Sequence, residues 1–390
     1  MPRGWIEGSM KIAVFGGSFD PVHTEHIRLA EAAITELGLD KLFVMPAHTP
    51  PHKKGKTLSP DEDRLAMCRL AFEGMEKVVI SDYEIAKGGT SYTYLTCRYF
   101  RELYPHADDE IFWIVGTDML RDFPTWKNPE DILQNVTLAV CGRAEEGNEW
   151  VEEEQQKFLR RFGVPFRWFS YNGAAVSSTK LRVLAGAGMR LTPLTDEKVE
   201  AYILENGLYS IPNASAALAL EKEERRAHSL RVAELAAAKA VKLGIPERKA
   251  IAAALFHDCA KNIPDGHELL QGFAMPQEWG NVPKEVAHQF TGAYVAERAF
   301  GVTDVEILDA IRYHTSARPQ MGTLEKLIFL ADMLEPQRRY DVVDELRALF
   351  EKDLDECLTE ALRQTLIFLE RKGGEIYSLT EKAYEYYAQK

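Results

Sequence analysis

The feature that most limits the possible folds is a change of pattern part-way along the chain. Up to about residue 210, helical stretches alternate with short β-rich runs, which are KIAVF (11–15), LFVMPA (42–47), KVVISDYEI (77–85), EIFWIVG (110–116), VTLAVCG (136–142) and PFRWFS (165–170). Apolar strands that alternate with helices predict a doubly wound parallel α/β sheet covered on both faces. From about residue 222 onward the periodicity is almost only helical, which predicts an all-α second half.

The length of the chain favours the same division. A chain of 390 residues exceeds one ordinary hydrophobic core. We therefore expect a flexible leader at 1–10, a first domain at 11–210, a linker at 211–222 and a second domain at 223–390. The leader lacks the apolar core of a secretory signal, and no stretch is apolar enough to span a bilayer. These features predict a cytoplasmic protein.

Charge and cysteine content narrow the possible partners. The chain has 47 basic and 60 acidic residues, a formal net charge of −13, so it repels nucleic acid unless a local basic patch intervenes. Any anionic substrate must be held by local cations. The five cysteines are scattered and form no CxxC pair, which is typical of reduced thiols. We expect small-molecule partners, no nucleic acid and no membrane, and the sequence leaves the oligomeric state open.

A candidate phosphate site stands at the end of the first β-rich run. Gly16 and Gly17 close the run, and His23 and His26 follow just before a helical pattern. Glycine lets the backbone approach a ligand closely, and the N–H groups at a helix start favour an anion such as a polyphosphate. The alternative is an ordinary glycine turn with two surface histidines. The complete string GGSFDPVHTEH at a strand end favours phosphate binding.

This string resembles the HxGH nucleotidyltransferases, which transfer an adenylyl group from ATP. Further motifs resemble the bacterial nicotinate-mononucleotide adenylyltransferases in the same order, and these are PPHK (50–53), SYT (91–93), GTDML (116–120), FPTWKNPEDIL (123–133), VSSTKLR (176–182) and YILENGLY (202–209). The resemblance implies a Rossmann-like domain in which nicotinate mononucleotide attacks the α-phosphorus of ATP. The products would be nicotinate adenine dinucleotide and pyrophosphate, with Mg²⁺ on the phosphate oxygens.

The resemblance also implies roles for individual residues. His23, His26 and Arg182 would act on the ATP phosphates, Asp118 would meet the adenosine ribose, and Trp126 would stack on the pyridine ring. The other substrate-binding candidates share places in the same motifs: Gly16, Gly17, Ser18, Phe19, Asp20, Lys53, Tyr92, Thr93, Gly116, Arg143, Ser177, Ser178 and Thr179. Three of these features have plainer alternatives. The hydroxyl-rich stretch 177–179 could be an ordinary N-cap, Lys53 part of a solvated loop, and Trp126 part of the core.

Glu25 departs from the family pattern, which has glycine between the two histidines. A glutamate adds bulk and negative charge beside a polyphosphate. Its side chain could point to solvent, it could weaken ATP binding, or the domain could be a nucleotide sensor that has lost catalysis and regulates the second half.

The second half carries histidines and aspartates on successive helical stretches. They are His228 in RRAHSLRVAE, His257 and Asp258 in ALFHDCAK, His288 in VAHQFTGAYVAE, His314 in IRYHTSA and Asp332 in LADMLEPQR. A single histidine on a helix is usually a core or surface residue, but this ordered set could project from facing helices into one cluster. On one helix His257 and Asp258 would point about 100° apart, so Asp258 could bridge two ions. Nitrogen and oxygen ligands suit iron, manganese or zinc.

These motifs resemble the HD-domain metal-dependent phosphohydrolases, and in detail the bacterial branch that splits diadenosine tetraphosphate symmetrically into two ADP. The resemblance implies one ion held by His228, His257, Asp258 and Asp332, and a second held by His288, His314 and Asp258. Two transition-metal ions are expected, with iron first and manganese or zinc also open. Lys261 could stabilise developing charge or be an ordinary surface lysine.

The sequence therefore predicts a bifunctional enzyme of NAD biosynthesis and dinucleoside polyphosphate hydrolysis. Two rivals stay open at this point. One changes the acceptor of the first reaction to phosphopantetheine. The other is the sensor described above, regulating an HD hydrolase of another nucleotide.

Overall fold

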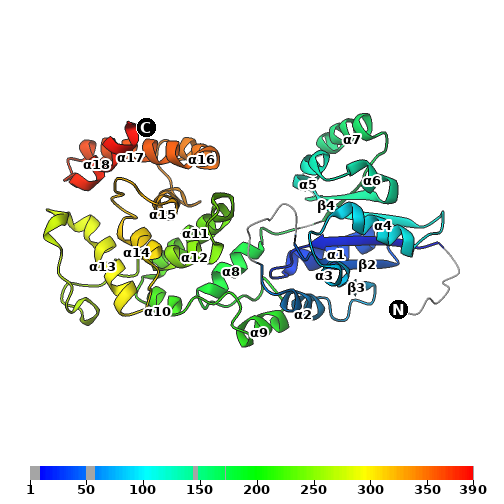
Figure 1. The fold of residues 1–390 in the computed structure, drawn as a ribbon, viewed down its shortest axis with the longest axis horizontal. Helices are drawn as coiled ribbons and strands as arrows, with labels where there is room; N and C mark the ends of the chain where they lie inside the picture. Colours follow the sequence, from blue (N-terminus) through cyan, green and yellow to red (C-terminus); the bar gives the residue numbers. More distant parts are fainter. Residues whose placement is uncertain (1–8, 50–57, 144–147, 172, 390) are drawn as a thin grey trace. The chain divides into compact units, whose positions relative to one another are not determined.

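A computed structural model describes residues 9–49, 58–143, 148–171 and 173–389 (Figure 1). Within these residues the chain divides into two compact units. One comprises the described residues up to 178 together with 191–206, and the other comprises residues 179–190 together with the described residues from 207 onward. The predicted leader at 1–10 lies outside the described residues as far as residue 8. No helix of the described chain is long and apolar enough to cross a membrane.

The first unit is built on one parallel sheet. Its described strands follow the order β3-β2-β1-β4-β5-β6. They are β1 (Lys11–Gly17), β2 (Lys41–Pro46), β3 (Val78–Ile80), β4 (Glu110–Gly116), β5 (Thr137–Arg143) and β6 (Arg167–Tyr171). The predicted doubly wound fold is confirmed. The strand order reverses between β1 and β4, and ligands bind in the crevice at the carboxyl ends of such strands.

The helices of this unit connect and cover the strands (Figure 1). They are α1 (Thr24–Glu36), α2 (Asp61–Ala71), α3 (Tyr83–Lys87), α4 (Thr93–Leu103), α5 (Thr117–Asp122), the 3-10 turn η2 (Phe123–Thr125), α6 (Pro129–Asn135), α7 (Asn148–Phe162) and α9 (Glu197–Glu205). The strands are apolar because both faces of the sheet are covered. Ile12, Val14 and Leu138, for example, have no exposed surface.

One predicted strand is wrong over half of its length. The run 77–85 forms a strand only at Val78–Ile80, and Tyr83–Lys87 forms α3. The three strand residues are β-branched, which suits a pleated surface. Beyond them the buried Glu84 carboxylate accepts a hydrogen bond from Thr96 Oγ1 at 2.7 Å. A long-range side-chain contact of this kind is not visible in a local pattern.

The second unit is helical throughout its described elements, as predicted. The helices are α8 (Ser178–Gly186), which begins with the last residue of the first unit, α10 (Ala214–Ala219), α11 (Glu223–Ala240), α12 (Glu247–Phe256), α13 (Lys284–Arg298), α14 (Val305–Arg312), α15 (Thr323–Leu334), α16 (Val343–Lys352), α17 (Leu354–Lys372) and α18 (Ser378–Ala388). Short 3-10 turns are η3 (Val241–Leu243), η4 (Glu268–Leu270) and η5 (Gln277–Trp279).

Alanines bring α11 and α12 close together in the centre of this unit. Ala233 and Ala236 on α11, and Ala250 and Ala253 on α12, have no exposed surface and belong to one buried cluster. Small side chains allow two helix axes to approach closely. His228 stands on α11, and His257 follows the last residue of α12, so the alanine contact brings these two candidate ligands close together.

Residues 179–190, which lie within the range expected for the first domain, pack in the second unit. Val183 and Ala187 near the end of α8 are buried in the same cluster as Ile211 and Ile251. Inside the predicted linker 211–222, α10 packs its buried residues into that cluster as well. The helix that carries the second phosphate signature is therefore packed, beyond its first residue, as part of the helical unit.

Candidate phosphate cavity and candidate metal centre

A cavity of about 510 Å³ opens in the first unit beside the carboxyl ends of β1 and β4. Its walls come from β1, α1, β4, the start of α5, β5, the end of β6 and the segment after β6. The lining residues include Gly16, His23, Glu25, His26, Gly116, Asp118, Ala174 and Val176. This is the crevice where the reversal of strand order favours a nucleotide, and it contains both predicted histidines.

His23 and His26 are stacked at the start of α1, with ring centroids 3.7 Å apart. The His23 backbone N–H donates to His26 Nδ1 at 3.1 Å. The proton of a neutral His26 ring must therefore be on Nε2, where it can be donated. Burial lowers the pKa of His23 to about 4, and its Nδ1 has no partner in the described structure. At neutral pH His23 thus offers hydrogen bonds rather than positive charge.

A buried arginine supports the loop between β1 and α1. Arg64 on α2 is fully buried, and its Nη1 donates to the carbonyl oxygens of Ser18 at 2.9 Å and Ala47 at 2.7 Å. Its Nε donates to the Ser59 carbonyl at 3.1 Å, and Nη2 pairs with Asp61. Arg64 was missed in the sequence, because nothing in the surrounding DRLAM pattern distinguishes it from a surface residue of α2.

Steric limits in this loop favour glycine at positions 16 and 17. A Cβ on Gly16 would lie 3.1 Å from the Trp113 ring, and one on Gly17 would lie 3.0 Å from the Phe19 ring. Phe19 itself has a positive φ of 48° and packs beside His26, with centroids 4.9 Å apart. Larger residues at these glycines would push the loop out of its place at the cavity wall.

Two further predicted residues, Asp20 and Asp118, each accept a hydrogen bond from a backbone N–H group. The buried Asp20 carboxylate accepts from the Ser59 N–H at 3.4 Å, and the Asp118 carboxylate accepts from the Met119 N–H at 2.8 Å. A Cβ on Gly116 would lie 2.7 Å from Asp118 Oδ1. Glycine therefore allows the Asp118 side chain to fold back over the end of β4.

Ser178 ties the second signature to the first. Its Oγ donates to the Pro21 carbonyl oxygen at 2.9 Å, joining positions 157 residues apart. Ser177 precedes it and is exposed. The beginning of α8 is therefore fixed beside the loop that leads to His23.

Arg182 and Thr179 make their contacts inside the helical unit. Arg182 is buried, and its Nη2 donates to Glu247 Oε1 at 2.5 Å and to Thr179 Oγ1 at 3.0 Å. Glu247 is the first residue of α12, which ends beside the metal centre. The phosphate role predicted for Arg182 stays a prediction, because here the guanidinium is paired with Glu247.

The predicted pyridine-binding residues lie apart from the described cavity wall. Trp126 is buried against Phe123, with ring centroids 5.4 Å apart. Tyr92 caps α4, whose first residue is Thr93, and Lys127 Nζ lies 4.1 Å from the Tyr92 ring centroid. Lys127 was not singled out in the sequence, although its place next to Trp126 was a signal.

Two predicted residues allow no statement about their side chains. Lys53 lies outside the described residues. Arg143 is the last residue of β5, and only its backbone position is described.

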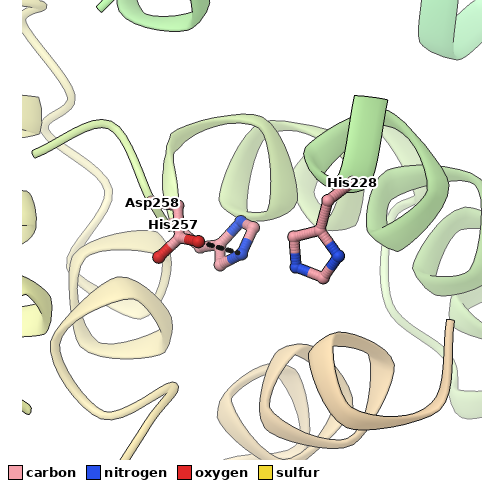
Figure 2. A group of neighbouring side chains, drawn as sticks. All are labelled: His228, His257 and Asp258. Atoms are coloured by element: carbon pink, nitrogen blue, oxygen red, sulfur yellow. Dashed lines mark ion pairs between the residues drawn. The ribbon is translucent and has the colours of Figure 1, made fainter. Parts of the chain in front are cut away.

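In the second unit, the six predicted ligands come together. His228, His257 and Asp258 form one group, His257, His314 and Asp332 a second, and Asp258, His288 and His314 a third. In each group the ligand atoms lie within 4.8 Å of one another. Figure 2 shows His228 on α11 facing the His257–Asp258 pair at the end of α12. Asp258 belongs to two of the groups and can bridge two ions.

The local geometry of His257 and Asp258 differs from the prediction of one continuous helix. α12 ends at Phe256, His257 caps it, and Asp258 lies in the following turn. His314 likewise lies beyond the end of α14. Helix ends leave carbonyl groups without partners along the helix, and these histidines use them.

Two histidines are fixed in the tautomer that a metal requires. His257 Nδ1 lies 2.6 Å from the Ala254 carbonyl oxygen, and His314 Nδ1 lies 2.7 Å from the Ile311 carbonyl oxygen. Each Nδ1 must donate, so each Nε2 presents a lone pair. His257 Nε2 is buried and has no hydrogen-bond partner in the described structure. These residues therefore fit divalent ions.

The charges at the cluster are consistent with ligation. Burial lowers the pKa of His257 to about 4, so its ring is neutral at pH 7. Burial alone would raise the pKa of Asp258, but His257, His288 and His314 hold that pKa well below its usual value. Neutral imidazoles and an ionised carboxylate are the forms that bind a metal.

Outer residues orient these ligands. The buried Gln289 accepts from the Thr315 and Ser316 backbone N–H groups, each at 3.0 Å, which fixes the turn after His314. Glu335 Oε1 lies 3.2 Å from His228 Nδ1, and Glu335 Oε2 accepts a hydrogen bond from Arg231 Nε at 2.7 Å. Burial would raise the pKa of Glu335, but the Arg231 hydrogen bond lowers it to about 2. Neither residue was predicted.

Three cationic side chains lie at the edge of the ligand cluster, each close to one of its carboxylates. Arg225 lies 3.0 Å and Lys261 3.4 Å from Asp258, and Arg338 lies 2.6 Å from Asp332. All three are partly exposed. Lys261 was predicted. Arg225 and Arg338 were missed, although Arg225 precedes His228 by one helical turn, which was a usable signal.

Comparison with known proteins agrees with this division of sites. Residues 14–184 match the cytidylyltransferase-like family and residues 225–337 match the HD domain. A protein of Mycoplasma genitalium named "Probable nicotinate-nucleotide adenylyltransferase/Ap4A hydrolase" is 30% identical over 334 residues, which cover 85% of this chain and 89% of the relative. The chain belongs to this family of nucleotidyltransferases fused to an HD domain.

Two further relatives place the fusion in context. A protein of Mycoplasma pneumoniae with the same name is 27% identical over 339 residues, covering 84% of this chain and 89% of the relative. A "Probable nicotinate-nucleotide adenylyltransferase" of Clostridium tetani is 34% identical over 199 residues, covering 51% of this chain and 98% of the relative. The fused family thus joins a nucleotidyltransferase that also occurs alone to an HD domain, which implies divalent-metal binding.

Proposed function

We propose that the first domain transfers the adenylyl group of ATP to nicotinate mononucleotide, giving nicotinate adenine dinucleotide and pyrophosphate. The observation that carries this proposal is the stacked His23–His26 pair at the wall of the cavity beside β1 and β4. The names of three relatives support the acceptor.

The chain supplies positioning and hydrogen bonds rather than covalent chemistry. The His26 Nε2–H and the N–H groups at the start of α1 would bind phosphate oxygens, and Mg²⁺ would arrive with ATP. Ser178 and the Arg64-supported loop hold these donors in place. Alignment of the two phosphates and stabilisation of the leaving pyrophosphate account for catalysis in reactions of this class.

A pyrophosphate-release assay with Mg²⁺ and ATP tests this function. Turnover is expected with nicotinate mononucleotide and not with phosphopantetheine, and the Trp126→Ala variant should lose activity toward the nucleotide while retaining ATP binding. Turnover with phosphopantetheine would change the acceptor. ATP binding without turnover, together with an ATP-dependent rate at the HD site, would favour the sensor.

We propose that the HD domain hydrolyses diadenosine tetraphosphate symmetrically into two ADP, with two transition-metal ions. Iron is our first expectation, and manganese or zinc is the alternative. The observation that carries the proposal is the six-ligand cluster bordered by Arg225, Lys261 and Arg338. Several cations beside metal ions suit a substrate with many negative charges. The names of two fused relatives support the substrate.

The ions would polarise the phosphate and activate water. Asp258 and the histidines would hold them, while Lys261 and the two arginines would bind the outer phosphates once metal takes their carboxylate partners. Product analysis by chromatography tests the proposal. ADP as sole product is expected, whereas ATP with AMP would show asymmetric cleavage. Loss of turnover on chelation, and its recovery with each metal in turn, would identify the ion.

A further inference from the structure

The structure indicates a use for Glu25, the residue that departs from the family motif. Its side chain is buried, with the residue only 5% exposed. Oε2 accepts a hydrogen bond from the Ala174 backbone N–H at 2.7 Å, and Oε1 pairs with Arg28 Nη1 at 2.9 Å. Both carboxylate oxygens therefore have partners within the first unit, so the side chain does not point to solvent.

The chain around Glu25 is shaped to receive its carboxylate. A Cβ on Gly173 would lie 2.6 Å from Glu25 Oε2 and 2.7 Å from the Tyr171 ring. Only the absence of a side chain at Gly173 lets the carboxylate reach the backbone beyond it. Glu25 and Gly173 thus form a complementary pair that joins α1 to the segment after β6.

This segment leads directly to the second phosphate signature. Residues 173–176 lead into Ser177 and Ser178, and Ser178 Oγ itself donates a hydrogen bond to the Pro21 carbonyl oxygen. The segment is therefore tied at both ends, by Glu25 to α1 and by Ser178 to the loop before α1. Ala174 and Val176 line the same cavity as His23 and His26, so a shift of the segment would change the cavity.

We propose that Glu25 is a positioning residue that fixes residues 173–176 against α1 and so presents Ser177 to the ATP phosphates. This inference rests on the proposed adenylyl transfer. Arg28 and the Ala174 N–H offset the carboxylate charge, which reduces its repulsion of a polyphosphate. Glu25, which stands where the family has glycine, then tethers the segment after β6 to α1 and does not disable the domain.

The test compares Glu25→Gln, Glu25→Ala and Glu25→Gly in the full-length protein. The amide oxygen of glutamine can still accept from the Ala174 N–H, whereas alanine and glycine cannot. We expect Ala and Gly to raise the KM for ATP about tenfold, the effect of losing one charge-assisted hydrogen bond. Gln should stay within about threefold of wild type. The KM for nicotinate mononucleotide should change little in all three variants.

Hydrogen–deuterium exchange supplies a readout that does not need turnover. Residues 173–177 should exchange faster in the Ala and Gly variants, and at the wild-type rate in the Gln variant. Glu31→Ala, which removes an exposed carboxylate from the same helix, is the matched control and should change neither KM nor exchange.

The outcomes separate this inference from the proposed function. A silent wild type with faster exchange in Ala and Gly would refute adenylyl transfer but retain the tether. Unchanged exchange in Ala and Gly, or a Gly variant that turns over as well as or better than wild type, would overturn the tether. A Gln variant that behaves as Ala would also overturn it, because charge and not the hydrogen bond would then be responsible.

Discussion

The two candidate sites differ in how their polar groups are satisfied. At the phosphate cavity, most groups already have protein partners: Asp118 binds a backbone N–H, Glu25 binds Arg28, and Ser178 binds a carbonyl. At the metal centre, Asp258 is surrounded by imidazoles and His257 Nε2 has no hydrogen-bond partner. Burying a polar or charged side chain costs several kcal/mol unless a hydrogen-bond partner, an opposite charge or a bound ion compensates it.

The difference indicates that the first site is arranged to bind a substrate, whereas the second is arranged to bind metal ions. The cavity is a rigid frame that receives a substrate carrying its own charge. The cluster is a set of ligands whose carboxylates are partly balanced by Arg225 and Arg338, while His257 Nε2 and Asp258 Oδ1 have no hydrogen-bond partner in the described structure. Variants at the centre should therefore change metal content first, and variants at the cavity should change loop position or stability first.

The largest effect should follow Asp258→Asn. Asp258 belongs to two of the ligand groups, so its loss should weaken both ions. Outer-shell partners of metal ligands contribute about 10–100-fold, and we expect a bridging ligand to exceed this, with hydrolysis falling more than about 1000-fold. Bound metal per chain, measured by atomic emission, should fall in parallel.

Asp265→Asn, an exposed carboxylate seven residues further along, is the matched control. It should leave metal content and hydrolysis unchanged, and adenylyl transfer should persist in both variants. Full metal content in Asp258→Asn would contradict the ligand assignment.

A large stability effect should follow Arg64→Met at the cavity. Methionine retains the apolar stem of the side chain but leaves Asp61 and the Ser18 and Ala47 carbonyl oxygens without their donor. Removing one partner of a buried ion pair costs about 3–5 kcal/mol. Urea unfolding followed by tryptophan fluorescence measures this, since five of the six tryptophans precede residue 170.

Arg69→Met, on the exposed side of the same helix α2, should cost less than about 0.5 kcal/mol. If the two variants were equally stable, Arg64 would not support the loop as described.

A pH dependence of stability should follow from His23. Its folded pKa of about 4 lies below the usual 6.5, so between these pH values the unfolded chain binds more protons than the folded chain. The free energy of unfolding should therefore fall as pH decreases from 6.5 to 4, by about 3 kcal/mol from this group, and should level off below pH 4.

His23→Asn keeps a good N-cap residue and removes the titration. Denaturant unfolding at pH 7 and at pH 5 should show a smaller loss in the variant than in wild type. Equal losses would mean that His23 is not buried in its neutral form.

The smallest effect should follow Arg338→Met beside the metal centre. Arg338 contacts Asp332 and is partly exposed, so we expect it to bind substrate phosphate after metal binding. The KM for diadenosine tetraphosphate should rise about tenfold, the effect of one charge-assisted hydrogen bond. Arg339→Met, an exposed neighbour, should leave the KM unchanged. Lost metal in Arg338→Met would instead indicate a role in holding Asp332.

Much of the fold could be predicted because its signals are local. The apolar runs gave the strands at Lys11–Gly17 and Glu110–Gly116 nearly to the residue, since a strand covered on both faces must be continuously apolar. The helical periodicity from about residue 222 onward predicted the all-α second half, where α15 and α17 lie. The prediction of a strand over 77–85 was wrong in its second half, where Glu84 on α3 accepts a hydrogen bond from Thr96 on another element.

The sequence by itself determined which chemical groups are present and in what order: two histidines at a strand-to-helix turn, and six candidate ligands in successive segments of the second half. Tertiary structure decided where each group points. Arg64 reaches the Ser18 carbonyl across 46 residues, and Glu25 reaches the Ala174 N–H across 149. Such partners are selected by packing and by the cost of leaving a buried charge unpaired, and neither can be read from neighbours along the chain.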